Sequence, residues 1–187
     1  MIKKILQKQE KVLHQVAEEV SIHDIKKTKI KKVLKEMSEA LKSQDDGVAI
    51  AAPQIGYSLR IFVVSSKIFH NDFFKDKDTL NQEPHPDPLL VKERDETQKD
   101  LVFINPKISK LSRKKEWVPE GCLSVRPLYG KTYRSLKATV AAYDENGEKF
   151  TRGASGILAQ IFQHETDHLN GILFIDHAKD IKEEIPK

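Results

Sequence analysis

The chain of 187 residues is 39% hydrophobic and 32% charged, and its formal net charge at pH 7 is +4. This length predicts one domain, residues 1–187, that is large enough to bury a core. A single cysteine cannot form a disulfide within the chain, and the apolar runs at 48–52 and 172–175 are far shorter than the ~20 residues that cross a bilayer. Disulfide-stapled secreted proteins and helical membrane proteins are excluded. No secretory signal is evident, so we expect a cytoplasmic protein.

An amphipathic helix is predicted near the N-terminus. Apolar side chains at positions 30, 33, 34, 37 and 41 follow the spacing of one helix face. The lysines between them are interpreted as the solvated face, the alternative being a weak attraction to RNA or another anionic surface. Since no nucleic-acid recognition motif accompanies them, no sequence-specific nucleic-acid partner is predicted.

Several strands are predicted after this helix. Residues 60–66 and 101–108 are rich in β-branched and aromatic side chains. Between them, residues 67–100 have no sustained periodicity and contain three prolines, so they are interpreted as a surface insertion. The sequence DENG at 144–147 separates two further strand-like runs and predicts a hairpin.

A second helix is predicted to begin at Ile157, with Ser155 as its N-cap, and to stop at Asn170 and Gly171. Residues 177–187 are expected to form a short, charged C-terminal tail. The strands, the hairpin and the late helix together predict an α+β fold with antiparallel sheets.

The late helix carries the sequence HETDH at 164–168. His164 and His168 are one turn apart, so both imidazoles can reach one ion, and Glu165 shares their face with Ile157 and Ile161. We therefore expect the antiparallel sheets to pack around a central metal-binding HExxH helix. Two buried histidines without a metal are the alternative.

An open metal site needs a third protein ligand. The HExxHxxGxxH class of protease has a histidine where this chain has Phe174, which excludes that class. Glu183 and Glu184 are close in count for another class, but they fall in the expected tail. Cys122 remains, within EGCLS at 120–124, where Gly121 permits close backbone approach; a buried and inert cysteine is the alternative.

Three segments occur in order along the chain: GVAIAAPQ at 47–54, EGCLS at 120–124 and QHETDHLNG at 163–171. Together they resemble the GxGxAAxQ, EGCLS and QHExDHLxG motifs of the peptide deformylase family. The resemblance covers most of the chain, from the N-terminal helix to about Asp176. It implies a hydrolase that removes the formyl group from N-formylmethionine of newly synthesised polypeptides and releases formate.

The resemblance also implies that Cys122, His164 and His168 hold one divalent metal, commonly iron(II), although the ligand set also suits zinc, nickel or cobalt. A bound metal lowers the pKa of water from 15.7 to about 7. Glu165 then accepts the proton of that water and delivers it to the departing amine.

Further roles follow from the resemblance. The Gln54 amide and the Leu123 backbone N–H are implied to stabilise negative charge on the formyl oxygen. The methionine pocket is implied to comprise Val48, Val118, Ile157 and Ile161, and generic core packing is the alternative for Val118 and Ile157. The main chain of Val48, Ala49 and Ile50 is expected to pair with the peptide as an added strand. The supporting residues are Gly47, Gly121 and an ion pair between Glu120 and Arg134.

Ala49 departs from the family pattern, because it stands where the second glycine is expected. A side chain there is costly if the backbone needs a positive φ and harmless if the segment is extended. Ala49 therefore leaves open a metal-binding relative with weak or altered activity. An HExxH metalloprotease and a non-enzymatic binding module are further alternatives. The expected partners are an N-formylmethionyl peptide and, transiently, the ribosome; no membrane partner is expected.

Overall fold

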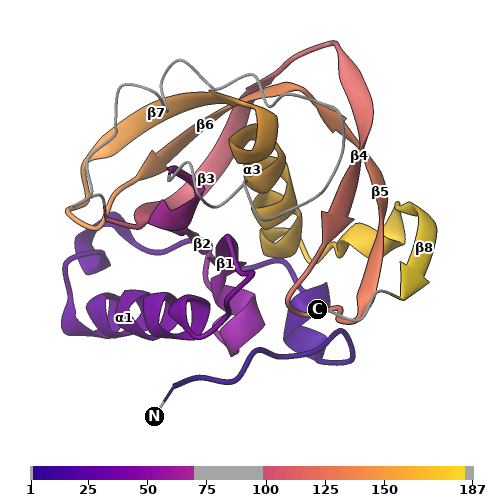
Figure 1. Cartoon of the computed structure of the whole chain (residues 1–187). Coiled ribbons are helices and arrows are strands. Elements are labelled where there is room, and N and C mark those ends of the chain that lie inside the picture. The colour runs from indigo at the N-terminus through magenta and orange to yellow at the C-terminus, as the bar shows by residue number, and fades with distance from the viewer. Residues whose placement is uncertain (1, 70–98, 184–187) are drawn as a thin grey trace.

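The structure is a computed structural model, which describes residues 2–69 and 99–183 (Figure 1). Helix α1, Thr28–Lys42, confirms the N-terminal helix, and the predicted apolar face is buried at Ile30, Val33, Met37 and Leu41. Most of the expected insertion at 67–100, including His70 and His85, lies outside the described residues; Ser66–Phe69 form a short 3-10 helix. No helix in the described part of the chain is long and apolar enough to cross a membrane.

A five-stranded antiparallel sheet forms the centre of the fold. It has the order β1-β2-β3-β6-β7, with β1 at one edge. The strands are Ala49–Ala51 (β1), Ile61–Val64 (β2), Leu101–Leu111 (β3), Lys137–Tyr143 (β6) and Lys149–Ser155 (β7). The predicted hairpin joins β6 to β7, and the Asp144 N–H closes its turn by donating to the Glu148 carbonyl at 3.0 Å.

Helix α3, Gly156–Leu169, begins one residue before the predicted Ile157 and ends at the predicted stop, with Ser155 at its N-cap and Asn170 at its C-cap. It packs on β1, β6 and β7 and also contacts the second sheet through β5 (Leu128–Ser135). In Figure 1, α3 accordingly lies between the large sheet and the hairpin that contains β5. This position brings a helix that carries two histidines against a loop from the second sheet.

The alternation of side chains along β2 creates two apolar layers. Phe62 and Val64 point to the α3 side, where Phe62 stacks on Phe103 with ring centroids 4.5 Å apart. Ile61 and Val63 point to the other face and pack in the cluster that includes the buried residues of α1. Since successive residues of a strand face opposite sides, the all-apolar sequence of β2 follows from its being covered on both faces.

The second sheet is antiparallel and three-stranded, with the order β4-β5-β8. It agrees with the expectation of antiparallel sheets, but its individual strands were not predicted from the sequence. Strand β4 is Lys115–Gly121 and contains Pro119, which argues against a strand in a sequence reading. Strand β8, Lys179–Glu183, is exposed at every residue, so it has no hydrophobic pattern to read. The expectation of a tail is wrong for these residues, because their backbone pairs with β5.

Candidate metal centre and active site

Three side chains from two elements form a compact cluster. His164 and His168 lie on α3 with ring centroids 4.9 Å apart, as their spacing of one helical turn predicts. Cys122 follows β4 directly, and its Sγ is 3.1 Å from His168 Nε2. One ligand atom from each of the three residues lies within 4.8 Å of the others.

Gly121 allows Cys122 to occupy this position. A Cβ added at Gly121 would lie 2.5 Å from the ring of Tyr129, its cross-strand partner on β5. The aromatic ring therefore packs directly over the backbone, and a side chain would have to displace it. The close approach that the sequence suggested is real, and the approaching group is a tyrosine ring.

The donor set fits a divalent transition metal. A thiolate and two imidazoles are ligands of zinc and of the neighbouring first-row metals, and metal bonds of about 2.0–2.3 Å suit donor atoms separated as these are. Among the described residues, Glu165 Oε2 is buried without a hydrogen-bond partner. Buried polar atoms usually have a partner, so this oxygen marks a place where a bound group or water would be accommodated.

Glu120 holds one of the imidazoles in place. His164 Nδ1 lies 2.6 Å from Glu120 Oε1, which leaves Nε2 as the nitrogen for a metal. The same carboxylate accepts from Thr132 Oγ1 at 2.6 Å, from Gln160 Nε2 at 3.3 Å, and from Arg134 Nη2 and Nε at 2.6 and 3.0 Å. The Glu120–Arg134 pair expected from the sequence thus lies directly behind His164.

These contacts determine how the buried groups ionise. Burial alone would raise the pKa of Glu120, but the hydrogen bonds from His164 and Arg134 hold it well below its usual range. Burial alone would lower the pKa of His164, and the hydrogen bonds to Cys122 and Glu120 reverse that direction. The carboxylate of Glu120 is therefore ionised, and it favours positive charge, from a proton or a metal ion, at His164.

Glu165 has a different environment. Its side chain is buried, and this burial raises its pKa to about 7, although His164 partly opposes the shift. A carboxyl group with a pKa near neutrality exchanges protons readily at physiological pH, which suits a general acid–base. Glu165 is therefore suited to the proton-transfer role that the sequence assigned to it.

Gln54 presents its amide to the same site. It lies on the 3-10 helix Ala52–Ile55, and the Ala51 N–H donates to its Oε1 at 2.8 Å. This bond fixes the amide orientation, so Nε2 points the other way, to Ser124 Oγ at 3.0 Å and Cys122 Sγ at 3.6 Å. A buried amide with its donor end facing the cluster can hydrogen-bond a developing negative charge.

Leu123 lies next to the cluster on the same loop. Its carbonyl accepts from Gln7 Nε2 at 3.2 Å, so the N-terminal segment helps to fix the loop. Within residues 2–69 and 99–183, no group accepts from the Leu123 N–H. Within the described residues, this N–H is therefore left to donate to a bound group.

The predicted substrate residues are assembled in part. Val48, Ile157 and Ile161 pack in one apolar cluster beneath α3, whereas Val118, on β4, is half-buried outside that cluster. The side chain of Ile50 packs in the other cluster, so this residue offers only its main chain. Strand β1 is the edge strand of the large sheet, which leaves one side of its backbone available to an added strand.

Ala49 and Gly47 adopt unstrained conformations. Ala49 is part of β1 and is not among the described residues with a positive φ, so its methyl group causes no backbone strain. A Cβ at Gly47 would lie 2.9 Å from the Gln44 Cβ, so the glycine is needed for close packing at the end of the loop after α1.

Several site residues were missed by the sequence analysis. Ser124 accepts from the Gln54 amide, and Thr132 and Gln160 bind Glu120. Asp167 Oδ2 lies 2.6 Å from Arg134 Nη1 and extends the buried ion pair. Ser124 and Asp167 lie inside the quoted motifs, so their position was a usable signal, whereas nothing local marks Thr132 or Gln160.

An α+β protein with two antiparallel sheets and an HExxH helix beside a cysteine loop is the class that this fold and site define. The polypeptide deformylase family matches the chain over residues 2–184. Peptide deformylase 2 of Clostridium acetobutylicum is 34% identical over 176 residues, which are 94% of each chain. The chain belongs to the peptide deformylase family, whose members are enzymes.

Further relatives and solved structures that the chain resembles are also peptide deformylases. The chloroplastic peptide deformylase 1A of Solanum lycopersicum is 34% identical over 165 residues, which are 88% of this chain and 55% of that longer protein. A Synechococcus elongatus peptide deformylase in complex with actinonin has a TM-score of 0.71 and 30% identity, covering 95% of this chain and 79% of its own. A Legionella pneumophila peptide deformylase has a TM-score of 0.73 and 29% identity, covering 96% and 88%.

Proposed function

We propose that this protein hydrolyses the formyl group from N-formylmethionyl peptides, using one divalent metal held by Cys122, His164 and His168. The observation that carries the proposal is that these three donors lie within 4.8 Å of one another. The buried Glu165 lies on α3, the helix that carries both histidines. The metal, when bound, supplies Lewis acidity that lowers the pKa of water. Iron(II) is our first choice, with zinc, nickel and cobalt as alternatives.

The chain's own residues supply the remaining chemistry. Glu165, with a pKa of about 7, takes a proton from the attacking water and returns it to the amine that leaves. The Gln54 Nε2 and the Leu123 N–H donate to the formyl oxygen as it gains negative charge. Glu120, fixed by Arg134, keeps the His164 ring in the orientation that leaves Nε2 for the metal.

Substrate binding is proposed to use the edge of the large sheet. The main chain of Val48, Ala49 and Ile50 would pair with the peptide backbone, which gives affinity with little demand on sequence. Val48, Ile157 and Ile161 would surround the methionine side chain, with Val118 at the rim. We further propose a single domain, a cytoplasmic location and transient encounters with the ribosome.

The test is formate release from a formyl-Met-Ala peptide by iron-loaded or nickel-loaded protein. We expect Glu165→Gln to lower kcat at least ~10²-fold, because it removes the group that moves the proton. Glu39→Gln, an isosteric change at a partly exposed glutamate of α1, is the matched control and should keep full activity. Metal content is measured for all three proteins.

The same assay separates the alternatives. Full activity of Glu165→Gln would remove Glu165 from the mechanism. Metal binding without formate release by the unmodified protein would favour the relative with weak or altered activity that Ala49 suggested. Cleavage of internal peptide bonds would favour a metalloprotease instead.

A further inference from the structure

An exposed aromatic pair lies on the outer face of the β4-β5-β8 sheet. Trp117 and Tyr133 are cross-strand partners with ring centroids 5.3 Å apart, and 44% and 53% of their respective surfaces are exposed. Side chains alternate between the two faces of a strand, so Glu120 on β4 and Arg134 on β5 point to the opposite, buried face, toward the candidate site. The pair therefore has no part in the proposed catalytic centre, and its exposure is unexplained by folding alone.

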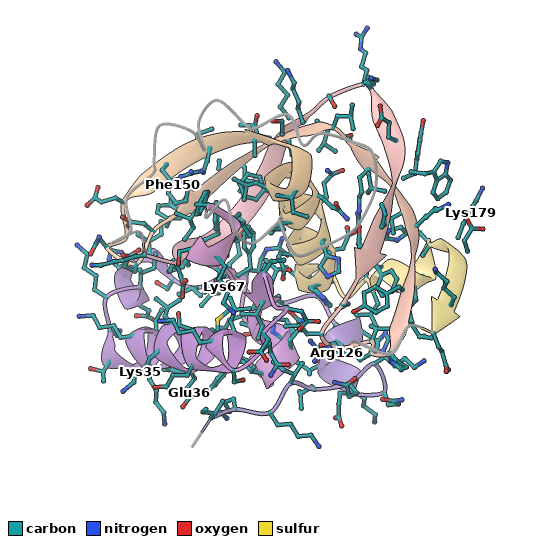
Figure 2. All side chains as sticks on the ribbon, viewed as in Figure 1. Lys35, Glu36, Lys67, Arg126, Phe150 and Lys179 are labelled. Atoms are coloured by element: carbon teal, nitrogen blue, oxygen red, sulfur yellow. The ribbon has the colours of Figure 1, made fainter. Side chains whose placement is uncertain are left out.

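Lysines surround these rings. Lys179 Nζ lies 4.6 Å from the Trp117 ring centroid, and Lys115 Nζ lies 5.9 Å from the Tyr133 ring centroid. Lys131 pairs with Lys179 in the strand register, so the two share a face, and Lys131 also forms an ion pair with Asp180 at 3.5 Å. Figure 2 shows Lys179 at the edge of the molecule formed by β8, on the side away from α1.

The combination of exposed aromatic rings and lysines indicates which class of partner fits this face. Flat rings stack on bases, and ammonium groups bind phosphates, so aromatic side chains interleaved with lysines suit a single-stranded nucleic acid. Protein interfaces are enriched in tryptophan and tyrosine but depleted in lysine, so the lysines beside the rings argue against a protein partner. Insertion into a lipid surface uses aliphatic side chains as well as rings. The exposed Ile181 approaches Gly130 on the face of β5 opposite to Tyr133. Ile181 therefore does not extend the aromatic pair into an apolar patch.

We propose that the outer face of the β4-β5-β8 sheet, with Trp117 and Tyr133 at its centre, binds single-stranded RNA without sequence preference. Each ring already has an ammonium group over it. On binding, a base replaces the ammonium over the ring and the lysine moves to a neighbouring phosphate; the base stack is stronger than the exposed cation–π contact that it replaces. The choice of RNA over DNA rests on the proposed function, because a protein that acts on newly made polypeptides encounters RNA.

Trp117 provides the measurement, because it is the only tryptophan in the chain. A 12-nucleotide oligouridine RNA is titrated into the metal-loaded full chain while tryptophan fluorescence is followed. Stacking should quench Trp117 saturably, and the affinity should fall as salt is raised, since each phosphate contact releases counterions. A blunt RNA duplex of the same length should bind more weakly, because its bases are already stacked.

Variants test the two components separately. Tyr133→Ala keeps the fluorescent reporter and should weaken RNA binding about tenfold through the lost base stack. Lys179→Ala should weaken it and reduce its salt dependence. Lys35→Ala, an equal loss of charge at an exposed position of α1, is the matched control and should leave the affinity unchanged. Formate release should be the same in all three variants, so RNA binding and the proposed activity can fail independently.

Several results would overturn the proposal. The first is the absence of quenching by RNA at low salt. The second is an equal affinity for RNA in Tyr133→Ala, Lys179→Ala and Lys35→Ala. The third is that a single-stranded DNA oligonucleotide of matching sequence binds more tightly than the RNA. Binding to phosphatidylserine vesicles without binding to RNA would assign the face to a membrane surface instead. Thermal unfolding of each variant shows whether it is folded, so a loss of binding is interpretable.

Discussion

Gln54 shows how the local backbone orients a single side chain for its proposed role. Its Oε1 accepts from the Ala51 N–H, which leaves Nε2 facing Cys122 and Ser124. If the amide were reversed, the Ala51 N–H would face a donor, so the local backbone determines which end of the side chain the site receives. Because folding already orients this amide, the proposed donor does not need to reorganise during the reaction.

Replacing this amide should reduce turnover and preserve the metal. We expect Gln54→Leu to lower kcat by ~10²–10³-fold, because one donor to the developing oxyanion is lost. The variant also leaves the Ala51 N–H without its acceptor, so the free energy of unfolding should fall by about 1–3 kcal/mol. Gln15→Leu, at an exposed position, is the control. Near-normal kcat in metal-loaded Gln54→Leu would contradict the role.

Cys122 should be essential for holding the ion. Cys122→Ser substitutes a poor ligand for a thiolate, so we expect bound metal below one equivalent and loss of formate release. Metal content after gel filtration, measured by atomic absorption, checks this directly. A Cys122→Ser protein that retains one tightly bound metal and full activity would show that the ion is held elsewhere.

At the scale of single residues, the sequence predicted those groups whose type and spacing are diagnostic. His164 and His168 were readable because helical periodicity alone places them together. Thr132 and Gln160 were not readable, because they meet at Glu120 only once β5 and α3 pack together. Contacts across elements depend on tertiary structure, which no local pattern encodes.

At the scale of elements, the buried ion pair connects β4, β5 and α3. Arg134 on β5 contacts Glu120 on β4 and Asp167 on α3 at 2.6 Å each. Its side chain is only 9% exposed, so water does little to screen these interactions. The second sheet is therefore attached to the metal-site helix by charge as well as by packing.

Removing one partner of this pair should be costly. We expect Arg134→Met to lower the free energy of unfolding by about 3–5 kcal/mol, because Glu120 and Asp167 are left without their cation. Lys107→Met removes an exposed ion pair with Glu19 and should cost less than about 1 kcal/mol. Urea denaturation of both proteins measures the free energies of unfolding. Equal decreases in the two variants would mean that the buried ion pair stabilises the fold no more than the exposed one.

The elements themselves were predicted unevenly, for physical reasons. Helix α3 and the β6–β7 hairpin were anticipated because caps and turn residues mark their ends. Strands β4 and β8 were not, since β4 contains a proline and β8 is exposed at every residue. A strand stabilised mainly by backbone pairing to β5 carries little information in its own side chains.

At the scale of the whole molecule, the metal should contribute to stability. The three donors come from the loop after β4 and from α3, so an ion that binds all of them stabilises only the folded state. We expect a chelator to lower Tm and added metal to restore it. Free metal at a hundredfold excess over Kd should raise the free energy of unfolding by about 2.7 kcal/mol. Calorimetry with and without chelator measures the shift. A Tm independent of metal would contradict a site built from these two elements.

The proposed reaction removes a formyl group at a metal-loaded active site and leaves the peptide intact. It is tested by mass spectrometry of a formyl-Met peptide incubated with iron-loaded protein, with formate quantified in the same sample. We expect one formate for each peptide that loses its formyl group, an intact peptide with a free N-terminal amine, and no such product with Glu165→Gln. Internal cleavage of the peptide, or equal formate from Glu165→Gln, would contradict it.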